Sequence, residues 1–299
     1  MNKDLACVIP AVTTPLQEDG SFDPQGMRNL VRNMVESGMK TLFLLGFAGE
    51  SQAFSREQRR EIIRTVREAV ADDVKIIAGV FDNATELIHA HVCDARTCGA
   101  DYVLAPPTNF YPLRDCEIER LFTDIAERSP LPLIIYNCPL NRHYIPGNVV
   151  ARLAVHPNIA GIKQTSDLWK VEQMQLAVRG IEGFTLLSGD EFAYFGAMAM
   201  GVEGFIMGGP GNVFPKKCVR IFENFKRGKF AEARDEYAKM IDFLFELYAL
   251  PFSEFGAVKG MLELSGICNR WVHKPVFSPT DEEMKIVRSL MQKHQVALD

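Results

Sequence analysis

The chain has 299 residues, of which 47% are hydrophobic and 24% are charged, and its formal net charge at pH 7 is −5. This composition is that of an ordinary globular protein, which excludes a disordered, collagen-like or coiled-coil chain. The negative net charge offers no positive surface for non-specific binding of nucleic acid or acidic membranes, so small metabolites or protein partners are expected instead.

The cysteines and the apolar stretches indicate the compartment. The seven cysteines are dispersed, odd in number and without CxxC spacing, so they predict neither a disulfide framework nor a zinc site. The first residues lack the basic region and long apolar stretch of a signal peptide. The longest nearly apolar stretch, residues 192–202, is well short of the roughly 20 residues that span a bilayer. We therefore expect a cytoplasmic protein without a membrane span.

Eight short apolar runs alternate along the chain with longer segments of helical periodicity, a pattern typical of βα units on a parallel sheet. Each run is nearly continuously apolar, as in strands that are buried on both faces. The starts of successive runs are about 28 residues apart on average, close to the length of one strand-plus-helix unit. The runs span residues 7–12, 41–45, 74–80, 102–105, 133–136, 160–163, 185–187 and 204–207.

The segments between the runs predict helices that pack outside the sheet. Residues 27–35 and 118–126 each carry apolar side chains at positions i, i+3, i+4, i+7 and i+8, which gives one apolar helix face. Ser55 and Gln58 have the spacing of a capping box, which predicts the start of the helix that follows the second run.

Eight βα units predict a (β/α)8 TIM barrel over residues 1–225. An open, doubly wound sheet is the alternative, because alternation alone does not show whether the sheet closes. Three further helical stretches follow at residues 230–250, 254–264 and 281–294, and a minimal barrel does not need them. We expect residues 226–299 to form C-terminal helices that pack on the barrel as part of one structural unit. The active site of such a barrel lies at the C-terminal ends of its strands.

Lys163 ends the sixth predicted strand, where the apolar run meets the catalytic face. A lysine in partly apolar surroundings has a lowered pKa, and its neutral amine is a nucleophile towards a ketone or an aldehyde. The alternative is a lysine that extends into solvent or pairs with an acid.

Tyr136 ends the neighbouring fifth strand. A phenol next to an imine can move the proton of a substrate hydroxyl, which the cleavage of an adjacent carbon-carbon bond requires. The alternative is a buried tyrosine whose hydroxyl is satisfied at the rim of the core.

Two further strand ends carry candidate binding groups. Residues 46–51, Gly-Phe-Ala-Gly-Glu-Ser, follow the second strand, and their backbone amides could face an anion such as a carboxylate. A tight turn that needs glycine at positive φ explains the same residues. Asp190 and Glu191 follow the seventh strand and could bind a polyol, or they favour the N-terminus of the next helix.

Metal and hydrolase chemistry have less support. His89 and His91 are two residues apart, which places them on different sides of a helix, and no HExxH motif is present. The chain contains no GxSxG motif, and Cys138 has no evident histidine partner, so it reads as a small apolar residue. We expect no metal and no other cofactor.

The combined motifs resemble the family of dihydrodipicolinate synthases and N-acetylneuraminate lyases, which are Schiff-base aldolases of the pyruvate type. The resemblance runs nearly end to end and implies a (β/α)8 barrel with C-terminal helices, a homotetramer, and catalysis without cofactor or metal. The motifs that carry it are Thr14-Pro15, Asp19-Gly20, Gly46 to Ser51, Tyr136-Asn137-Cys138-Pro139 and Gly161-Ile162-Lys163.

The resemblance also implies roles for these residues. Lys163 forms the imine with C2 of a 2-oxo acid, and Tyr136 moves the proton of the C4 hydroxyl while the C3–C4 bond breaks or forms through an enamine. The substrate carboxylate lies against the amides of Ala48 and Gly49. The backbone at Ile206 on the eighth strand corresponds to a further contact with pyruvate.

The chain departs from the family pattern in the loop after the second strand. The family carries hydroxyl residues where this chain has Phe47 and Ala48, so a proton relay must run through water, through Tyr111 or through another group. Tyr111 is a loose match to the relay tyrosine of the family.

Other departures concern the second substrate. The synthase branch has an arginine where this chain has Asn141, with Arg142 one residue later, which argues against dihydrodipicolinate synthesis. Residues 163–168 and the pair of Asp190 and Glu191 are more similar to the neuraminate lyase branch. Residues 208–212, however, replace the serine-bearing loop of that branch.

These observations lead to the hypothesis of a lyase that cleaves a 2-oxo-3-deoxy sugar acid to pyruvate and an aldehyde, or condenses the two. Its binding partners are then a small 2-oxo acid and an aldehyde, and neither nucleic acid nor a membrane. The alternatives are a dihydrodipicolinate synthase, a dehydratase that uses the same imine, and a barrel that binds 2-oxo acids without turnover.

Overall fold

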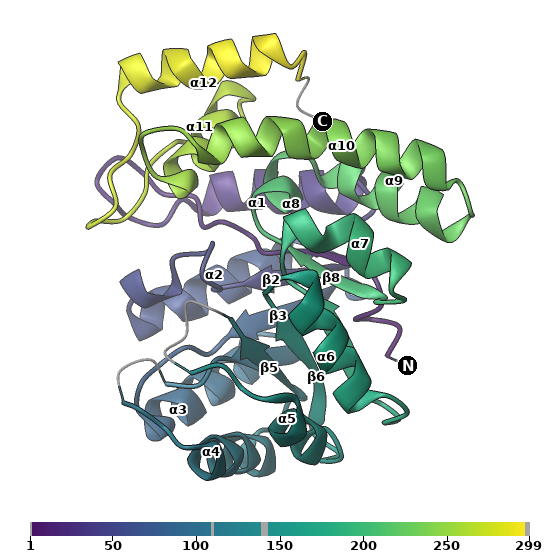
Figure 1. Cartoon of the computed structure of the whole chain (residues 1–299). Helices are drawn as coiled ribbons and strands as arrows, with labels where there is room; N and C mark the ends of the chain where they lie inside the picture. The colour runs from purple at the N-terminus through teal and green to yellow at the C-terminus, as the bar shows by residue number, and fades with distance from the viewer. Residues whose placement is uncertain (1, 109–110, 139–142, 297–299) are drawn as a thin grey trace.

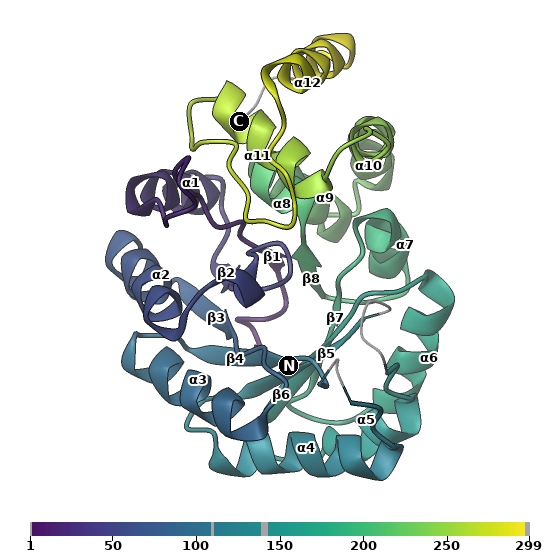
Figure 2. The ribbon, with the colours of Figure 1, turned by 90° about the vertical axis from the view of Figure 1, so that its left-hand side faces the viewer.

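Eight parallel strands curve into a barrel with helices around it (Figures 1 and 2). The computed structural model describes residues 2–108, 111–138 and 143–296. All eight predicted strands are present, and the predicted (β/α)8 barrel is confirmed. The strands are β1 (Val8–Pro10), β2 (Thr41–Leu44), β3 (Lys75–Gly79), β4 (Tyr102–Ala105), β5 (Leu133–Asn137), β6 (Ile159–Gln164), β7 (Thr185–Ser188) and β8 (Gly204–Met207).

The order of the strands excludes the open, doubly wound alternative. The hydrogen-bonded order is β1-β8-β7-β6-β5-β4-β3-β2, so each strand lies beside its neighbours in the chain, and the first strand pairs with the last. The remaining seam lies between β1 and β2. There the backbone amide of Val12 donates to the carbonyl of Phe43 at 2.8 Å, and Ala11 forms an isolated parallel bridge with Phe43.

The helices follow the strands and cover the outside of the barrel (Figure 2). Their apolar faces pack on the sheet, and the predicted capping box of Ser55 and Gln58 is confirmed at the start of α2. The helices that follow β1 to β7 are α1 (Pro24–Glu36), α2 (Arg56–Ala69), α3 (Thr85–Thr97), α4 (Asp115–Arg128), α5 (Gly147–Leu153), α6 (Leu168–Val178) and α7 (Tyr194–Ala199). Two short 3-10 helices, η1 (Ser51–Ala53) and η2 (Glu191–Ala193), precede α2 and α7.

Apolar side chains fill both sides of the strands. The larger cluster lies between the strands and the helices, and a second cluster fills the interior of the barrel. This double burial explains why the strands are nearly continuous apolar runs rather than alternating ones. Fully buried members of the interior cluster include Ile9, Phe43, Ile77, Leu104, Ile134, Leu187 and Ile206.

The chain continues beyond β8 through α8 (Gly209–Val213) and α9 (Pro215–Lys226). Three C-terminal helices then lie together on the side of the barrel that carries α1, α8 and α9 (Figures 1 and 2). They are α10 (Phe230–Tyr248), α11 (Glu254–Leu264) and α12 (Asp281–Lys293), close to the predicted ranges. The sequence analysis missed α8, because its Gly-Pro-Gly start is typical of a loop. Within the described ranges, no helix combines the length and the apolar composition needed to cross a bilayer.

Candidate active site

The side chain of Lys163 is buried at the C-terminal end of β6, with 6% of the residue exposed. The pairing of β5 with β6 places Tyr136 directly beside it, and the Lys163 Nζ lies 4.3 Å from the centroid of the Tyr136 ring. Burial lowers the pKa of Lys163 to about 8, although Cys138 and Glu191 act in the opposite direction. A substantial fraction of the amine is therefore neutral and nucleophilic near pH 7.5.

Gly189 makes room for this lysine. A Cβ atom at position 189 would lie 2.7 Å from Cε of Lys163 and 2.3 Å from Oγ1 of Thr165, both closer than side chains approach one another. The turn after β7 therefore has to carry glycine for the amine to keep its position.

Tyr136 is 5% exposed, and burial, together with Cys138, raises its pKa well above the usual value of a phenol. The hydroxyl of Thr165 forms a hydrogen bond with it, which acts in the opposite direction. The phenol is thus held in its protonated form next to the lysine. Such a group can donate a proton to an oxygen of a bound substrate, or exchange one with it.

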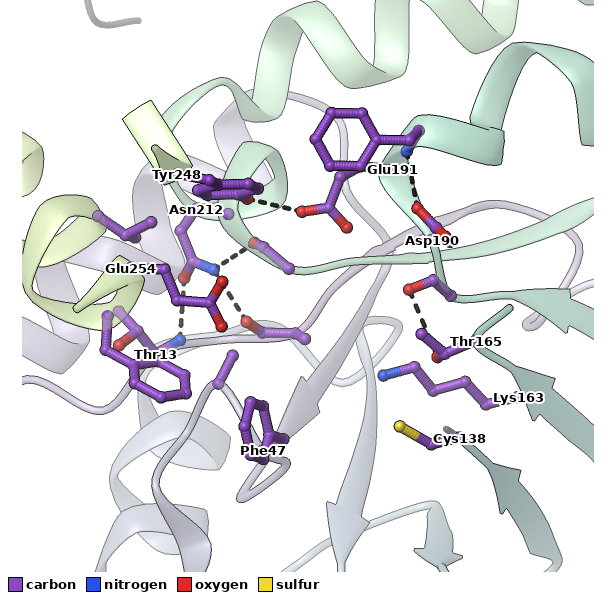
Figure 3. A pocket seen from close by; sticks show the side chains of 18 of the residues that line it. Thr13, Phe47, Cys138, Lys163, Thr165, Asp190, Glu191, Asn212, Tyr248 and Glu254 are labelled. Carbon is purple, nitrogen blue, oxygen red and sulfur yellow. Dashed lines mark hydrogen bonds between the residues drawn. The ribbon is translucent and has the colours of Figure 1, made fainter. Parts of the chain in front are cut away.

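Lys163 and Tyr136 line a cavity of about 310 Å³ at the C-terminal ends of the strands. Figure 3 shows Lys163 in its wall. The loop after β2 contributes Phe47 and Ala48 to its wall, and the turn after β7 contributes Asp190 and Glu191. The segment after β8 and two C-terminal helices form another part of the wall, with Gly208, Gly209, Asn212, Tyr248, Glu254, Phe255 and Val258.

The wall opposite Lys163 is acidic and phenolic (Figure 3). Tyr248 donates a 2.6 Å hydrogen bond to Oε1 of Glu191, and burial raises the pKa of Glu191. Gly209 makes this contact possible, because a Cβ atom there would lie 2.1 Å from the hydroxyl of Tyr248. Asp190 caps η2 by accepting from the amide of Phe192 at 2.9 Å, so it lines the cavity and also serves the helix N-terminus. Among the described residues that line the whole cavity, Lys163 is the only lysine or arginine.

The loop after β2 presents backbone amides. In the ranges that the structure describes, the amides of Ala48 and Gly49 have no hydrogen-bond partner. The hydroxyl of Thr14 holds the carbonyl of Gly49 at 2.8 Å. Phe47 is 47% exposed, and its ring lies 5.1 Å from that of Phe255. Unpaired amides on adjacent residues are a common binding element for anions.

The structure therefore brings five of the predicted site residues to one cavity: Lys163, Tyr136, Ala48, Asp190 and Glu191. The other three do not line this cavity. Gly49 lies next to Ala48, and Ile206, whose backbone is the predicted contact, lies on β8 with its side chain buried inside the barrel. Tyr111 is 57% exposed and lines a separate cavity between α3 and α4.

Several residues of the predicted motifs lie outside the described part of the chain. They are Asn141 and Arg142, which bear on the synthase branch, and also Pro139, Asn109 and Phe110.

Sequence reasoning missed Tyr248, Glu254 and Phe255, because they lie on C-terminal helices whose sequences resemble those of ordinary packing helices. It also missed Thr165, although this residue follows Lys163 within the same strand-end motif. Among the described residues, no group of three or more His, Cys, Asp and Glu side chains could hold a metal ion.

Comparison with known proteins identifies relatives of this chain. The model of the dihydrodipicolinate synthetase family matches residues 4–294. A 4-hydroxy-tetrahydrodipicolinate synthase of Hyphomonas neptunium is 31% identical over 274 residues, which cover 91% of this chain and 92% of the relative. A putative mitochondrial 4-hydroxy-2-oxoglutarate aldolase of Coccidioides immitis is 30% identical over 236 residues, which cover 77% of this chain and 74% of the relative.

Two solved structures are similar to this chain over nearly its whole length. YagE, a prophage protein of E. coli K12 solved in complex with pyruvate, is 25% identical and superposes with a TM-score of 0.91, covering 97% of this chain and 99% of YagE. The sialic acid aldolase of Ruminococcus gnavus superposes with a TM-score of 0.91 over 98% of both chains. At 23% identity, this second likeness shows the shared fold alone.

The lowered pKa of Lys163 leads to a prediction about its reactivity. Acylation by trace acetic anhydride requires the neutral amine, so its rate at Lys163 should rise about tenfold per pH unit up to about pH 8 and then level off. Peptide mass spectrometry after competitive labelling measures this rate residue by residue. An ordinary lysine in water levels off near pH 10.4, which is the reference for this profile. A plateau for Lys163 near pH 10.4 would contradict the effect of burial.

The close approach at Gly189 leads to a second prediction. Gly189→Ala should displace Lys163 and Thr165 and lower the free energy of unfolding by about 1–3 kcal/mol, because the added methyl overpacks the site. Thermal unfolding measures the loss of stability, and the labelling profile of Lys163 measures the displacement. A stable variant with an unchanged profile would show that the lysine does not depend on this glycine.

Proposed function

This chain belongs to the dihydrodipicolinate synthetase family, and on that premise we propose that it cleaves a 2-oxo-3-deoxy sugar acid to pyruvate and a hydroxylated aldehyde, or condenses the two. Members of the family are lyases and aldolases of the class I Schiff-base type, so the chain is an enzyme of that type. The observation that carries the proposal is the buried Lys163 amine of lowered pKa, which lies beside Tyr136 in a cavity with an acidic opposite wall.

The chemistry begins at Lys163. Its neutral amine attacks C2 of the 2-oxo acid, and loss of water gives an iminium that accepts electrons from the C3–C4 bond. The phenol of Tyr136 accepts the proton of the C4 hydroxyl as it passes its own proton through the hydroxyl of Thr165 to water in the cavity, and the same route later returns a proton to C3. As the C3–C4 bond breaks, its electron pair forms an enamine, and C4 leaves as the aldehyde carbon. Protonation of C3 and hydrolysis of the imine release pyruvate and restore the amine.

Thr165 supports this role of Tyr136. Its hydroxyl forms a hydrogen bond with the phenol and lies 3.4 Å from the carbonyl oxygen of Gly189. It lines the same cavity, whereas Phe47 and Ala48 carry no hydroxyl. We assign to Thr165 the hydroxyl of the proton relay within this chain, in which Tyr111 lines another cavity.

The two ends of the cavity fit the two ends of the substrate. The amides of Ala48 and Gly49 are free to bind the carboxylate next to the C2 carbonyl. Asp190 and Glu191 can accept hydrogen bonds from the hydroxyls of the aldehyde portion. Because acidic side chains repel an anionic aldehyde, this wall favours a hydroxylated and uncharged partner over one with a second carboxylate.

We also propose that the protein forms a homotetramer and lies in the cytoplasm. Leu168 and Trp169 at the start of α6 are 38% and 71% exposed, an apolar surface suited to contact with a second copy in a homotetramer. None of the seven cysteines, all of which lie in the described ranges, forms a disulfide, as in proteins of the reducing cytoplasm.

The experiment that tests the proposed function traps the imine. We expect pyruvate and borohydride to form a reduced adduct on Lys163 that peptide mass mapping identifies, and Lys163→Met should abolish it. Lys170→Met is the matched control, because this lysine, whose side chain is 43% exposed, lies on α6 and outside the cavity. A folded wild-type protein that forms no adduct on Lys163 would rule out the lyase, the synthase and the dehydratase together. If the adduct forms, product analysis separates these three, since only the lyase releases pyruvate and an aldehyde.

The hydrogen bond between Tyr248 and Glu191 leads to a prediction about the aldehyde end. Tyr248→Phe removes the donor from Glu191, which should lower kcat/KM for condensation with a hydroxylated aldehyde about tenfold, the equivalent of one hydrogen bond to a charged group. Trapping of pyruvate on Lys163 should stay unchanged. Tyr237→Phe is the matched control, because this tyrosine lies on the same helix and donates to the carbonyl of Phe192. An equal loss in both variants would assign Tyr248 to packing alone.

A further inference from the structure

A buried ion pair links the C-terminal helices to the loop after β2. Lys259 on α11 is completely buried, and its Nζ lies 2.5 Å from Oε1 of Glu50, whose side chain is 8% exposed. The Nζ also donates to the carbonyl of Trp271 at 2.7 Å. The other oxygen of Glu50 accepts from the amide of His273 at 2.7 Å. Both charges thus have partners from the C-terminal segment, and neither side chain lines the cavity of Lys163.

The backbone around Glu50 shows what this pair holds in place. Glu50 directly follows Gly49 and has a left-handed conformation, with φ of 53°, which is uncommon for a residue with a side chain. Its amide donates to the carbonyl of Phe47 at 3.0 Å, which closes the turn over Ala48 and Gly49. The amides of Ala48 and Gly49, which have no acceptor among the described residues, therefore lie within a turn, and Lys259 holds the last residue of this turn through the ion pair.

The same helix also shapes the cavity directly. Val258 precedes Lys259 and lines the cavity, and Phe255, one helical turn earlier, contacts the ring of Phe47. One stretch of α11 therefore both supports the loop after β2 and forms the wall that faces it (Figure 3 shows this wall).

A buried ion pair is not needed for stability, because well-packed apolar residues of similar volume are often as stable or more stable in its place. We therefore explain the ion pair by the position in which it holds the loop after β2, and not by the stability that it adds. Resting on the proposed function, we propose that Lys259 and Glu50 form a positioning pair, which holds the amides of Ala48 and Gly49 where they bind the carboxylate of the 2-oxo acid.

The test uses the double variant Lys259→Met with Glu50→Gln. This variant removes both charges together, and the glutamine keeps an acceptor for the amide of His273, so no buried charge is left unpaired. The matched control is Lys285→Met with Glu282→Gln, which makes the same two changes in an exposed pair on α12. Thermal unfolding verifies that both double variants are folded.

Two ligands separate carboxylate binding from imine formation. Pyruvate and acetone both form an imine with a lysine, but acetone has a methyl group in place of the carboxylate. In the double variant, the pyruvate concentration that gives half-maximal trapping on Lys163 should rise about tenfold or more, as for a lost hydrogen bond to a charged group. Trapping of acetone on Lys163 should stay within about twofold of wild type, since the amine itself is untouched.

Amide hydrogen exchange of residues 46–51 measures the loop without any ligand. We expect faster exchange of this segment in the double variant than in wild type and in the control. Unchanged exchange together with unchanged half-saturation by pyruvate would overturn the proposal, and an equal loss for pyruvate and acetone would overturn it as well. If wild type itself traps no pyruvate, the proposed function fails, whereas faster exchange in the variant would still show that the pair positions the loop.

Discussion

The site depends on the burial of one amine. Lys163 stands at the end of β6 between aromatic rings, with its Nζ 4.3 Å from the ring of Tyr136 and 5.4 Å from that of Phe43. Burial disfavours the charged form, and Cys138 and Glu191 offset this effect only in part. Among the described residues, no ion pair involves this lysine. The barrel thus keeps a larger fraction of this amine neutral near pH 7.5 than water would.

The C-terminal helices are part of the site and not only a support for it. Strand ends provide Lys163 and Tyr136, which carry the bond-making chemistry, and helices α10 and α11 close the cavity with Tyr248, Glu254 and Phe255. The strand ends thus carry the chemistry, and the helices shape the cavity. The strand ends are fixed by sheet hydrogen bonds, whereas the helical wall can vary in sequence without changing the strands. The wall is therefore where relatives with different aldehyde partners would be expected to differ.

The sequence allowed most of the fold to be predicted, because each strand of this barrel is buried on both faces and reads as an apolar run. The pairing of Lys163 with Tyr136 was also accessible, since parallel strand ends meet at one edge. The contacts of Tyr248 with Glu191, and of Lys259 with Glu50, were not accessible. They join residues 57 and 209 positions apart, and only the packing of α10 and α11 against the barrel brings them together. The contact between β1 and β2, which closes the barrel, was not accessible either, because the periodicity of apolar residues does not show whether a sheet closes.

The close contact between Gly209 and Tyr248 limits which residues these two positions can carry. The hydroxyl of Tyr248 occupies the place that any Cβ at position 209 would take, at 2.1 Å. A substitution at position 209 would displace the phenol from Glu191, and a smaller residue at position 248 would leave a void above the glycine. The two positions are therefore sterically coupled, since a residue with a Cβ at position 209 requires the side chain of Tyr248 to move or to be replaced. In related chains, we expect the residues at these two positions to vary together.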